Sequence, residues 1–197
     1  MEADNRVKME PHPQRSIAIS RLAIWSLTAW LGLVMPTLAA TPTEYQLKAV
    51  FLFNFIQFVE WPSSGSDPEQ GPLCVGVLGP DPFGSDLEAV MQGEQISGRP
   101  IVVQRYATVD EIDLCHLLFI GALDAGQVEI ALEQLKGRPI LTVGETAEFI
   151  DAGGMIRFIT ESSRIRLQVN LRAADEARLR LSSKLLRSSQ IVARMGN

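Results

Sequence analysis

The stretch Leu73-Cys74-Val75-Gly76-Val77-Leu78-Gly79 decides the fold of this chain. Such a short, almost wholly apolar run is typical of a strand that is buried on both faces of a sheet. Similar runs follow it at 99–105, 114–120 and 139–143. Helices are predicted between these runs, over 81–91 and 124–136. Strands that alternate with helices in this way predict a parallel sheet with helices on both faces.

A different pattern follows the fourth strand. Residues 155–160 and 165–170 alternate in polarity on either side of Glu161-Ser162-Ser163-Arg164, which predicts an antiparallel hairpin. Short helices are predicted over 145–151, over 173–177 and after Ser182-Ser183. The sequence therefore predicts one layered α/β domain with a mixed sheet, parallel in one part and antiparallel at its C-terminal hairpin.

The first forty residues have the pattern of an export signal. A basic segment precedes the apolar run LAIWSLTAWLGLVM at 22–35, and Thr37 and Ala39 suit positions −3 and −1 of a cleavage site. We predict a signal peptide over 1–39 and a single domain over 41–197, with cleavage after Ala40 as the second choice. The competing interpretation is an uncleaved anchor, because the uncharged stretch is just long enough to span a bilayer.

Composition excludes several classes of protein. The 197 residues are 46% hydrophobic, which suits one globular domain, and the net charge of −5 argues against a nucleic-acid partner. Two histidines and two cysteines are too few for an ordinary zinc site. We therefore predict no metal site and no nucleic-acid partner.

The two cysteines, Cys74 and Cys115, each lie near the start of an apolar strand. If those strands are neighbours, the cysteines lie side by side, and in an oxidising compartment they are expected to form a disulfide. The alternative is two separate buried thiols.

The segment before the first strand is predicted to be a helix. It starts at Thr41-Pro42-Thr43-Glu44, which resembles a capping box, and Pro62 ends it near Glu60. Its many aromatic residues indicate a buried central helix, or one that leaves an aromatic edge for a partner. Candidate partner or ligand residues at this helix are Phe53, Glu60 and Trp61.

The predicted hairpin supplies the other candidates. Arg157, Arg164 and Arg166 gather on it in an acidic chain, and Arg157 and Arg166 are expected to share one face. They form cross-strand pairs with acidic neighbours, or an edge that binds an anion or a partner. We add Asn170, at the end of the hairpin, as a further candidate.

No group of residues predicts catalysis. Gly76-x-x-Gly79-x4-Gly84 departs from the dinucleotide-binding spacing, and Asp81 places a negative charge where a pyrophosphate would bind. His116, alone in its strand, is more typical of a packed residue than of a base. We therefore predict no catalytic residues and no cofactor, although a hydrolase that uses His116 stays as a weaker hypothesis.

Several stretches, in the same order along the chain, resemble the YfiR family. They are 44–49, 51–55, 58–62, 74–79, 115–121, 141–144, 153–158, 169–171 and 181–186. The resemblance implies a periplasmic, non-enzymatic regulator that binds the periplasmic sensor portion of an inner-membrane diguanylate cyclase and represses it. It also implies a homodimer, relief of repression by an outer-membrane lipoprotein, and a match of Cys74 and Cys115 to one family disulfide.

The resemblance leaves two points open. The best-known member of the family has a second disulfide, for which this chain has no further cysteines. Family members also occur beside other sensor proteins, so the partner is a diguanylate cyclase or another sensor. The alternative function is a periplasmic sensor domain that binds a small molecule near Trp61 and the hairpin arginines.

Overall fold

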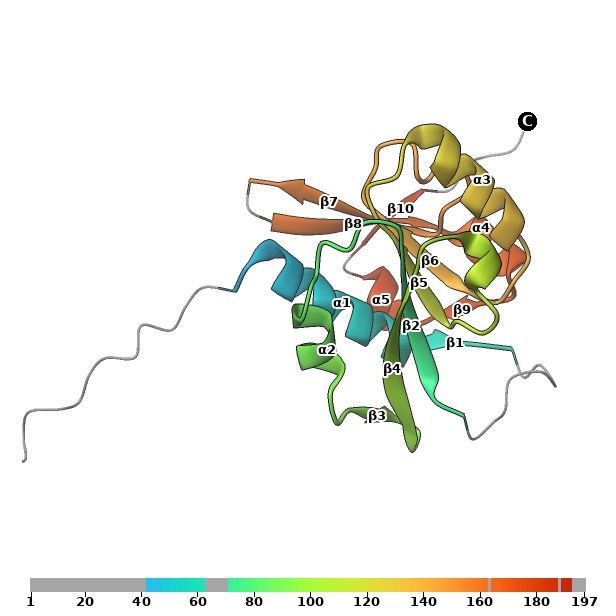
Figure 1. The fold of residues 1–197 in the computed structure, drawn as a ribbon. Helices are drawn as coiled ribbons and strands as arrows, with labels where there is room; N and C mark the ends of the chain where they lie inside the picture. The colour runs from blue at the N-terminus through green and yellow to red at the C-terminus, as the bar shows by residue number, and fades with distance from the viewer. Residues whose placement is uncertain (1–41, 63–70, 163, 188, 193–197) are drawn as a thin grey trace, which may run out of the picture. The chain divides into compact units, whose positions relative to one another are not determined.

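The computed structural model describes residues 42–62, 71–162, 164–187 and 189–192, and the predicted signal peptide lies outside these ranges. Within them, an eight-stranded sheet has the order β10-β8-β7-β6-β5-β2-β4-β3 (Figure 1). Its strands are β2 Leu73–Leu78, β3 Gln95–Ile96, β4 Arg99–Tyr106, β5 Leu117–Ile120, β6 Leu141–Gly144, β7 Ile156–Glu161, β8 Arg164–Asn170 and β10 Ser189–Val192. A separate antiparallel pair joins β1 (Val59–Glu60) to β9 (Arg180–Leu181).

Strand directions follow the predicted division of the sheet. Neighbouring strands from β4 through β2, β5 and β6 to β7 are parallel. The hairpin of β7 and β8 is antiparallel, and β10 pairs in parallel with the outer edge of β8. The predicted fold class, a mixed sheet with a parallel part and an antiparallel hairpin, is confirmed.

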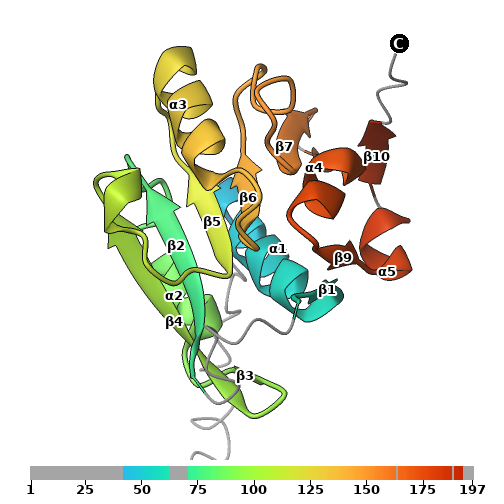
Figure 2. The same ribbon diagram turned by 90° about the vertical axis from the view of Figure 1, so that its right-hand side faces the viewer.

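Helices cover both faces of the sheet (Figure 2). They are α1 Glu44–Phe58, α2 Asp86–Met91, α3 Ala125–Leu135, α4 Leu171–Glu176 and α5 Ser183–Leu186, with a short 3-10 helix at Val109–Glu111. Buried side chains of α1, α2, α4 and α5 share one core with Val75 and Val77 of β2. Those of α3 share a second core with Cys74 and Leu78, which point to the opposite face. The alternating side chains of the buried strand therefore serve two cores.

The first helix begins two residues later than the expected cap. Thr43 is the N-cap residue, and its hydroxyl accepts a hydrogen bond from the backbone N–H of Gln46 at 3.2 Å. The Gln46 side chain accepts one from the Thr43 N–H, which completes the capping box. The helix ends at Phe58, because the next two residues form β1 and pair with β9.

The predicted helix over 145–151 is wrong, because this segment forms a series of turns. Phe149 is fully buried, and its ring lies directly against the backbone of Gly144 and Gly154. A Cβ atom at either glycine would lie closer than 3.0 Å to the ring. Tight packing around this aromatic residue therefore determines the course of the segment, more than its helix propensity.

Candidate functional site

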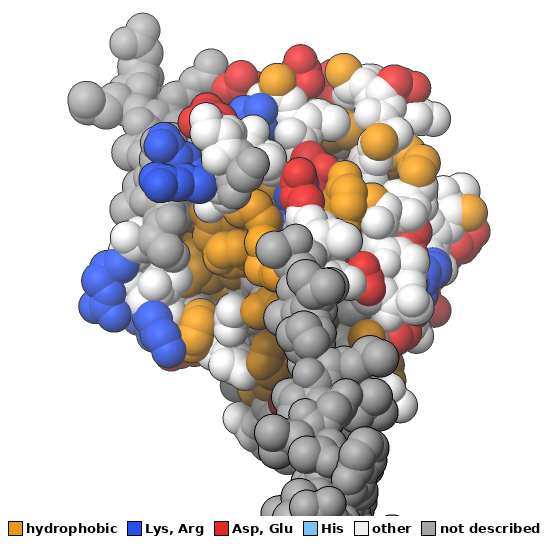
Figure 3. All heavy atoms as spheres, turned by 90° about the vertical axis from the view of Figure 1, so that its left-hand side faces the viewer, with side chains coloured by type: hydrophobic (Ala, Val, Ile, Leu, Met, Phe, Trp, Pro, Cys, Tyr) orange, Lys and Arg blue, Asp and Glu red, His pale blue; other side chains and the backbone are white. Residues whose placement is uncertain are grey.

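One face of α1 is turned to solvent and is mostly apolar, with Asn54 and the exposed Gln57 as its polar residues. We name Leu47, Val50, Phe51, Asn54 and Phe58 the α1 outer stripe, since their spacing places them on one side of the helix. Leu47 and Val50 are 41% and 44% exposed, and the other three are half-buried. Figure 3 shows an apolar area on this side of the molecule, with Lys and Arg side chains along one edge. A stripe of this kind marks an interaction surface more often than a free surface.

The charges near the outer stripe differ between its two ends. At the N-terminal end, Glu44 is exposed and the Gln46 amide donates to the carboxylate of Asp86 at 3.2 Å. At the C-terminal end, the Lys184 ammonium lies 4.4 Å from the centre of the Phe58 ring. Arg187, the first residue after α5, is exposed. The stripe is therefore acidic at one end and basic at the other.

The predicted partner residues of α1 and β1 differ in accessibility. Phe53 is half-exposed and packs against the core on the α1 face. Glu60 is exposed in β1, opposite Arg180. The Trp61 indole N–H donates to the backbone carbonyl of His116 at 3.2 Å. Trp61 therefore ties β1 to the sheet and is only partly available to a partner.

The hairpin arginines lie on the sheet face opposite to α1. The register pairs Arg157 with Gln168 and Ile159 with Arg166, so the two arginines share one face, as the sequence predicted. Phe158 points to the other face, where its ring lies 5.9 Å from that of Phe51. The structure therefore places the predicted arginines and the α1 outer stripe on different faces of the hairpin.

The two arginines also differ in their contacts. Arg157 is half-buried and donates to the backbone carbonyl of Glu145 and to the Gln168 amide oxygen, both at 3.3 Å. Arg166 is exposed and lies 3.6 Å from the Glu161 carboxylate. Arg157 is thus largely structural, and Arg166 is the better candidate for binding a partner.

A buried lysine links α1 to the segment after β6, and sequence reasoning missed it. Lys48 is 3% exposed, and its ammonium lies 2.8 Å from a carboxylate oxygen of Glu145 and also binds Glu44. Burial acts to lower the pKa of Lys48, but hydrogen bonds to Glu145 and Glu44 outweigh burial and raise it. The only sequence signal was that Lys48 is the single charge between Tyr45 and Phe58.

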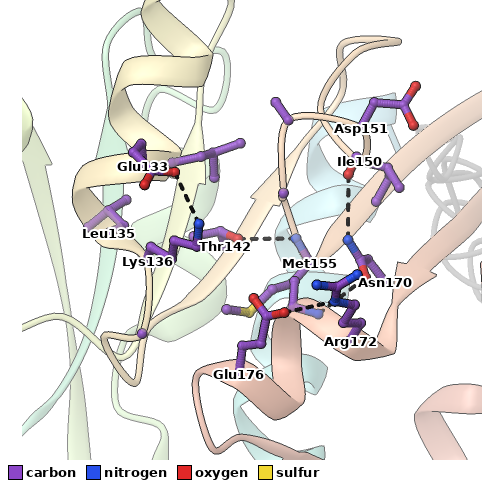
Figure 4. Close-up of a pocket in the computed structure, with 15 residues that line it drawn as sticks. Glu133, Leu135, Lys136, Thr142, Ile150, Asp151, Met155, Asn170, Arg172 and Glu176 are labelled. Atoms are coloured by element: carbon purple, nitrogen blue, oxygen red, sulfur yellow. Dashed lines mark hydrogen bonds and ion pairs between the residues drawn. The ribbon is translucent and has the colours of Figure 1, made fainter. Parts of the chain in front are cut away.

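A pocket of about 280 Å³ lies between α3, the segment before β7 and α4 (Figure 4). Its apolar lining comes mainly from Leu132, Leu135, Ile150 and Met155. Charged groups at its rim are Glu133, Lys136, Asp151, Arg172 and Glu176. Asn170 also lines it, as the N-cap residue of α4, with its side-chain oxygen accepting from the Ala173 N–H at 3.2 Å.

The predicted disulfide is not formed in the structure. Cys74 and Cys115 are free, buried thiols. The strands β2 and β5 are neighbours as predicted, but their register places His116 beside Cys74, so the cysteines are offset by one residue. A hydrogen bond with the Cys115 thiol lowers the pKa of Cys74, and the same contact together with burial raises the pKa of Cys115.

His116 is a buried, packed residue, as its place in an apolar run predicted. Its Nδ1 accepts a hydrogen bond from the Cys74 backbone N–H at 3.1 Å, and the Arg99 guanidinium lies 3.2 Å from its Nε2. Both ring nitrogens are engaged within the fold. Nothing in this geometry supports the hydrolase hypothesis.

The described ranges are 42–62, 71–162, 164–187 and 189–192. They contain no group of three or more His, Cys, Asp or Glu side chains placed to hold a metal ion. None of their helices is both long enough and apolar enough to cross a membrane.

Comparison with known proteins shows what this chain is similar to. A family model described as YfiR/HmsC-like matches residues 45–190. A solved structure titled as a conserved domain protein from Vibrio cholerae O1 biovar eltor is similar with a TM-score of 0.47 and 10% sequence identity. The similarity covers 77% of this chain and 61% of that one, so the chain spans less than two thirds of its length.

Proposed function

The chain belongs to the YfiR/HmsC-like family, and from this premise we propose that it binds the periplasmic sensor portion of an inner-membrane diguanylate cyclase and represses that enzyme. The family implies a periplasmic regulator of cyclic-di-GMP signalling. The single observation that carries the proposal is the family match over residues 45–190. We include in the proposal that residues 1–39 are the export signal and that residues 41–197 are the working domain.

The surface of the described domain supports a binding function. The α1 outer stripe includes apolar side chains that are exposed and not part of the core, and Arg166 of the hairpin is also exposed. Apolar and guanidinium groups together are typical of protein interfaces, where they supply buried area and directed hydrogen bonds. In this proposal the protein works without catalysis and without a cofactor, as a homodimer that an outer-membrane lipoprotein releases from the sensor.

Capture of the sensor tests this function. We expect the wild-type protein to retain the purified periplasmic portion of the sensor, and Arg166→Glu to bind it about tenfold more weakly, because a reversed charge repels the group that the arginine meets. Deletion of the gene is expected to raise cellular cyclic-di-GMP. The measurement is a titration of immobilised sensor at fixed salt concentration.

The matched control is Arg178→Glu, which makes the same charge change at another exposed arginine. Equal loss in both variants would assign the effect to net charge and not to the hairpin. Failure of the wild-type protein to bind any membrane sensor encoded nearby would refute the proposed function.

The pocket favours a second candidate function, the binding of a small molecule with an apolar body and polar groups. Its volume of about 280 Å³ suits a ligand of few atoms, and its rim offers groups of both signs. Ala173 lines the pocket, so Ala173→Phe is expected to fill it. A ligand at a hundred times its Kd should stabilise the wild-type protein by about 2.7 kcal/mol and leave Ala173→Phe unchanged. Thermal unfolding with a panel of small amphiphilic metabolites checks this, and equal shifts in both proteins would exclude the pocket.

A further inference from the structure

After its first residue, Glu44, the outward side of α1 has no charged side chain. Lys48 is the only charged residue between Tyr45 and Phe58, and it points into the fold. The outer stripe runs from Leu47 to Phe58, which is about 16 Å at the rise of an α-helix. It contains two of the four large hydrophobic side chains that are exposed in the described part of the chain.

Oppositely charged groups stand at the two ends of this stripe. At its N-terminal end lie the carboxylate of Asp86, which accepts from the Gln46 amide, and that of Glu44, which is exposed and already binds Lys48 and Thr160. Lys184 lies at its C-terminal end, with its ammonium 4.4 Å from the centre of the Phe58 ring, and Arg187, three residues further along the chain, is exposed. A matching surface must therefore be basic at one end and acidic at the other.

This requirement separates the candidate occupants. An anionic lipid surface has the same sign everywhere, so it would attract Lys184 and repel Glu44 and Asp86. A second α1 that runs antiparallel supplies the required reversal, because its acidic end then meets the basic end of the first. If Leu47 of one copy faces Phe58 of the other, the twofold axis passes between residues 52 and 53, so that Phe51 faces Asn54 and Val50 lies close to the axis.

We propose that the α1 outer stripe is the interface between two copies of this chain, with the two α1 helices antiparallel. This inference rests on the homodimer included in the proposed function and adds the surface that forms it. A stable interface buries about 1,600 Å² in total, which is more than one helix supplies. The half-exposed Ile165 of the hairpin and Leu186 of α5 pack against the same core as α1, and the proposed interface includes them.

The oligomeric state of protein purified from periplasmic extract tests the proposal. We expect the wild-type protein to sediment as a dimer. Val50→Glu should weaken dimerisation about a hundredfold or more, because it buries two like charges in an apolar contact close to the twofold axis. The double variant Lys184→Glu/Arg187→Glu should also weaken it and should reverse its dependence on salt, since the ends of the stripe then repel each other.

The matched control is Ile130→Glu, since Ile130 is 61% exposed on α3, on the opposite side of the sheet. It is expected to remain as dimeric as the wild-type protein, and circular dichroism confirms that each variant is folded. A wild-type monomer at every concentration would contradict the homodimer itself. A wild-type dimer that Val50→Glu leaves intact would keep the homodimer and overturn its assignment to α1.

Discussion

Replacing Lys48 with methionine is expected to lower the free energy of unfolding by about 3 kcal/mol. The change keeps an unbranched side chain of similar length but removes the ammonium that binds Glu145 and Glu44. Glu145 is only 27% exposed, so its carboxylate loses its cation in a place that water reaches poorly. Urea unfolding at neutral pH, followed by tryptophan fluorescence, measures the loss.

The pH dependence gives this prediction a second readout. The Lys48 hydrogen bond, followed by that of Thr160, lowers the pKa of Glu44, so its contribution is present above pH 4.5 and is lost as the pH falls through the lowered pKa. The pKa of Lys48 is raised, so its contribution is complete below pH 10.5 and is lost as the pH rises through the raised pKa. Lys48→Met should therefore show a flatter dependence in both ranges.

The double variant Lys48→Met/Glu145→Gln provides the control. It removes the Glu145 carboxylate together with the Lys48 ammonium, so no unpaired charge is left at this position. Its loss of unfolding free energy should therefore be about 1–3 kcal/mol smaller than the sum of the losses of the two single variants. A loss below about 1 kcal/mol for Lys48→Met would contradict the role given to the buried lysine.

Gly121→Ala is expected to destabilise the fold by about 3 kcal/mol or more. Gly121 follows β5 and donates its backbone N–H to the carbonyl of Leu78 at 2.9 Å. An added Cβ would lie far inside the van der Waals distance from the carbonyl oxygen of Pro80. The obstacle is backbone and not a flexible side chain, so the ends of two central strands would have to separate. Thermal and urea unfolding measure the effect.

Gly126→Ala is the matched control, because Gly126 lies in the first turn of α3 and the nearest atom to its added Cβ, a carboxylate oxygen of Asp124, is 3.5 Å away. It should leave stability unchanged or raise it by up to about 1 kcal/mol, since alanine favours a helix. If both variants unfold alike, the close approach at Gly121 does not limit stability.

Local sequence patterns determined most of the architecture. The apolar run at 73–79 predicted β2, and alternating polarity predicted the hairpin of β7 and β8. Both signals depend only on side-chain periodicity along a strand, which a sequence displays directly. A helix was predicted over 81–91, but Asp81 accepts a hydrogen bond from the Phe83 N–H and pairs with Arg105, and α2 begins only at Asp86. That difference arises from a partner distant in sequence.

The candidate sites depended on contacts that no local pattern records. Cys74 and Cys115 lie on neighbouring strands, as expected. The register between these strands, however, places His116 and not Cys115 opposite Cys74, and a shift of one residue moves a side chain to the other face of a sheet. Phe158 packs against Phe51 of α1, so Arg157 and Arg166 point to the opposite face of the hairpin. The aromatic helix and the hairpin arginines, which the sequence suggested as parts of one binding surface, therefore lie on different faces.

Residue types and periods therefore determined which elements form and that α1 is rich in apolar groups. Only the tertiary structure decided that Lys48 is buried against Glu145 and that Leu47 and Val50 are left outside. A helix that is apolar all round can bury any of its sides. The buried side is the one whose side chains fit the neighbouring core and whose single charge, that of Lys48, is paired there with the Glu145 carboxylate.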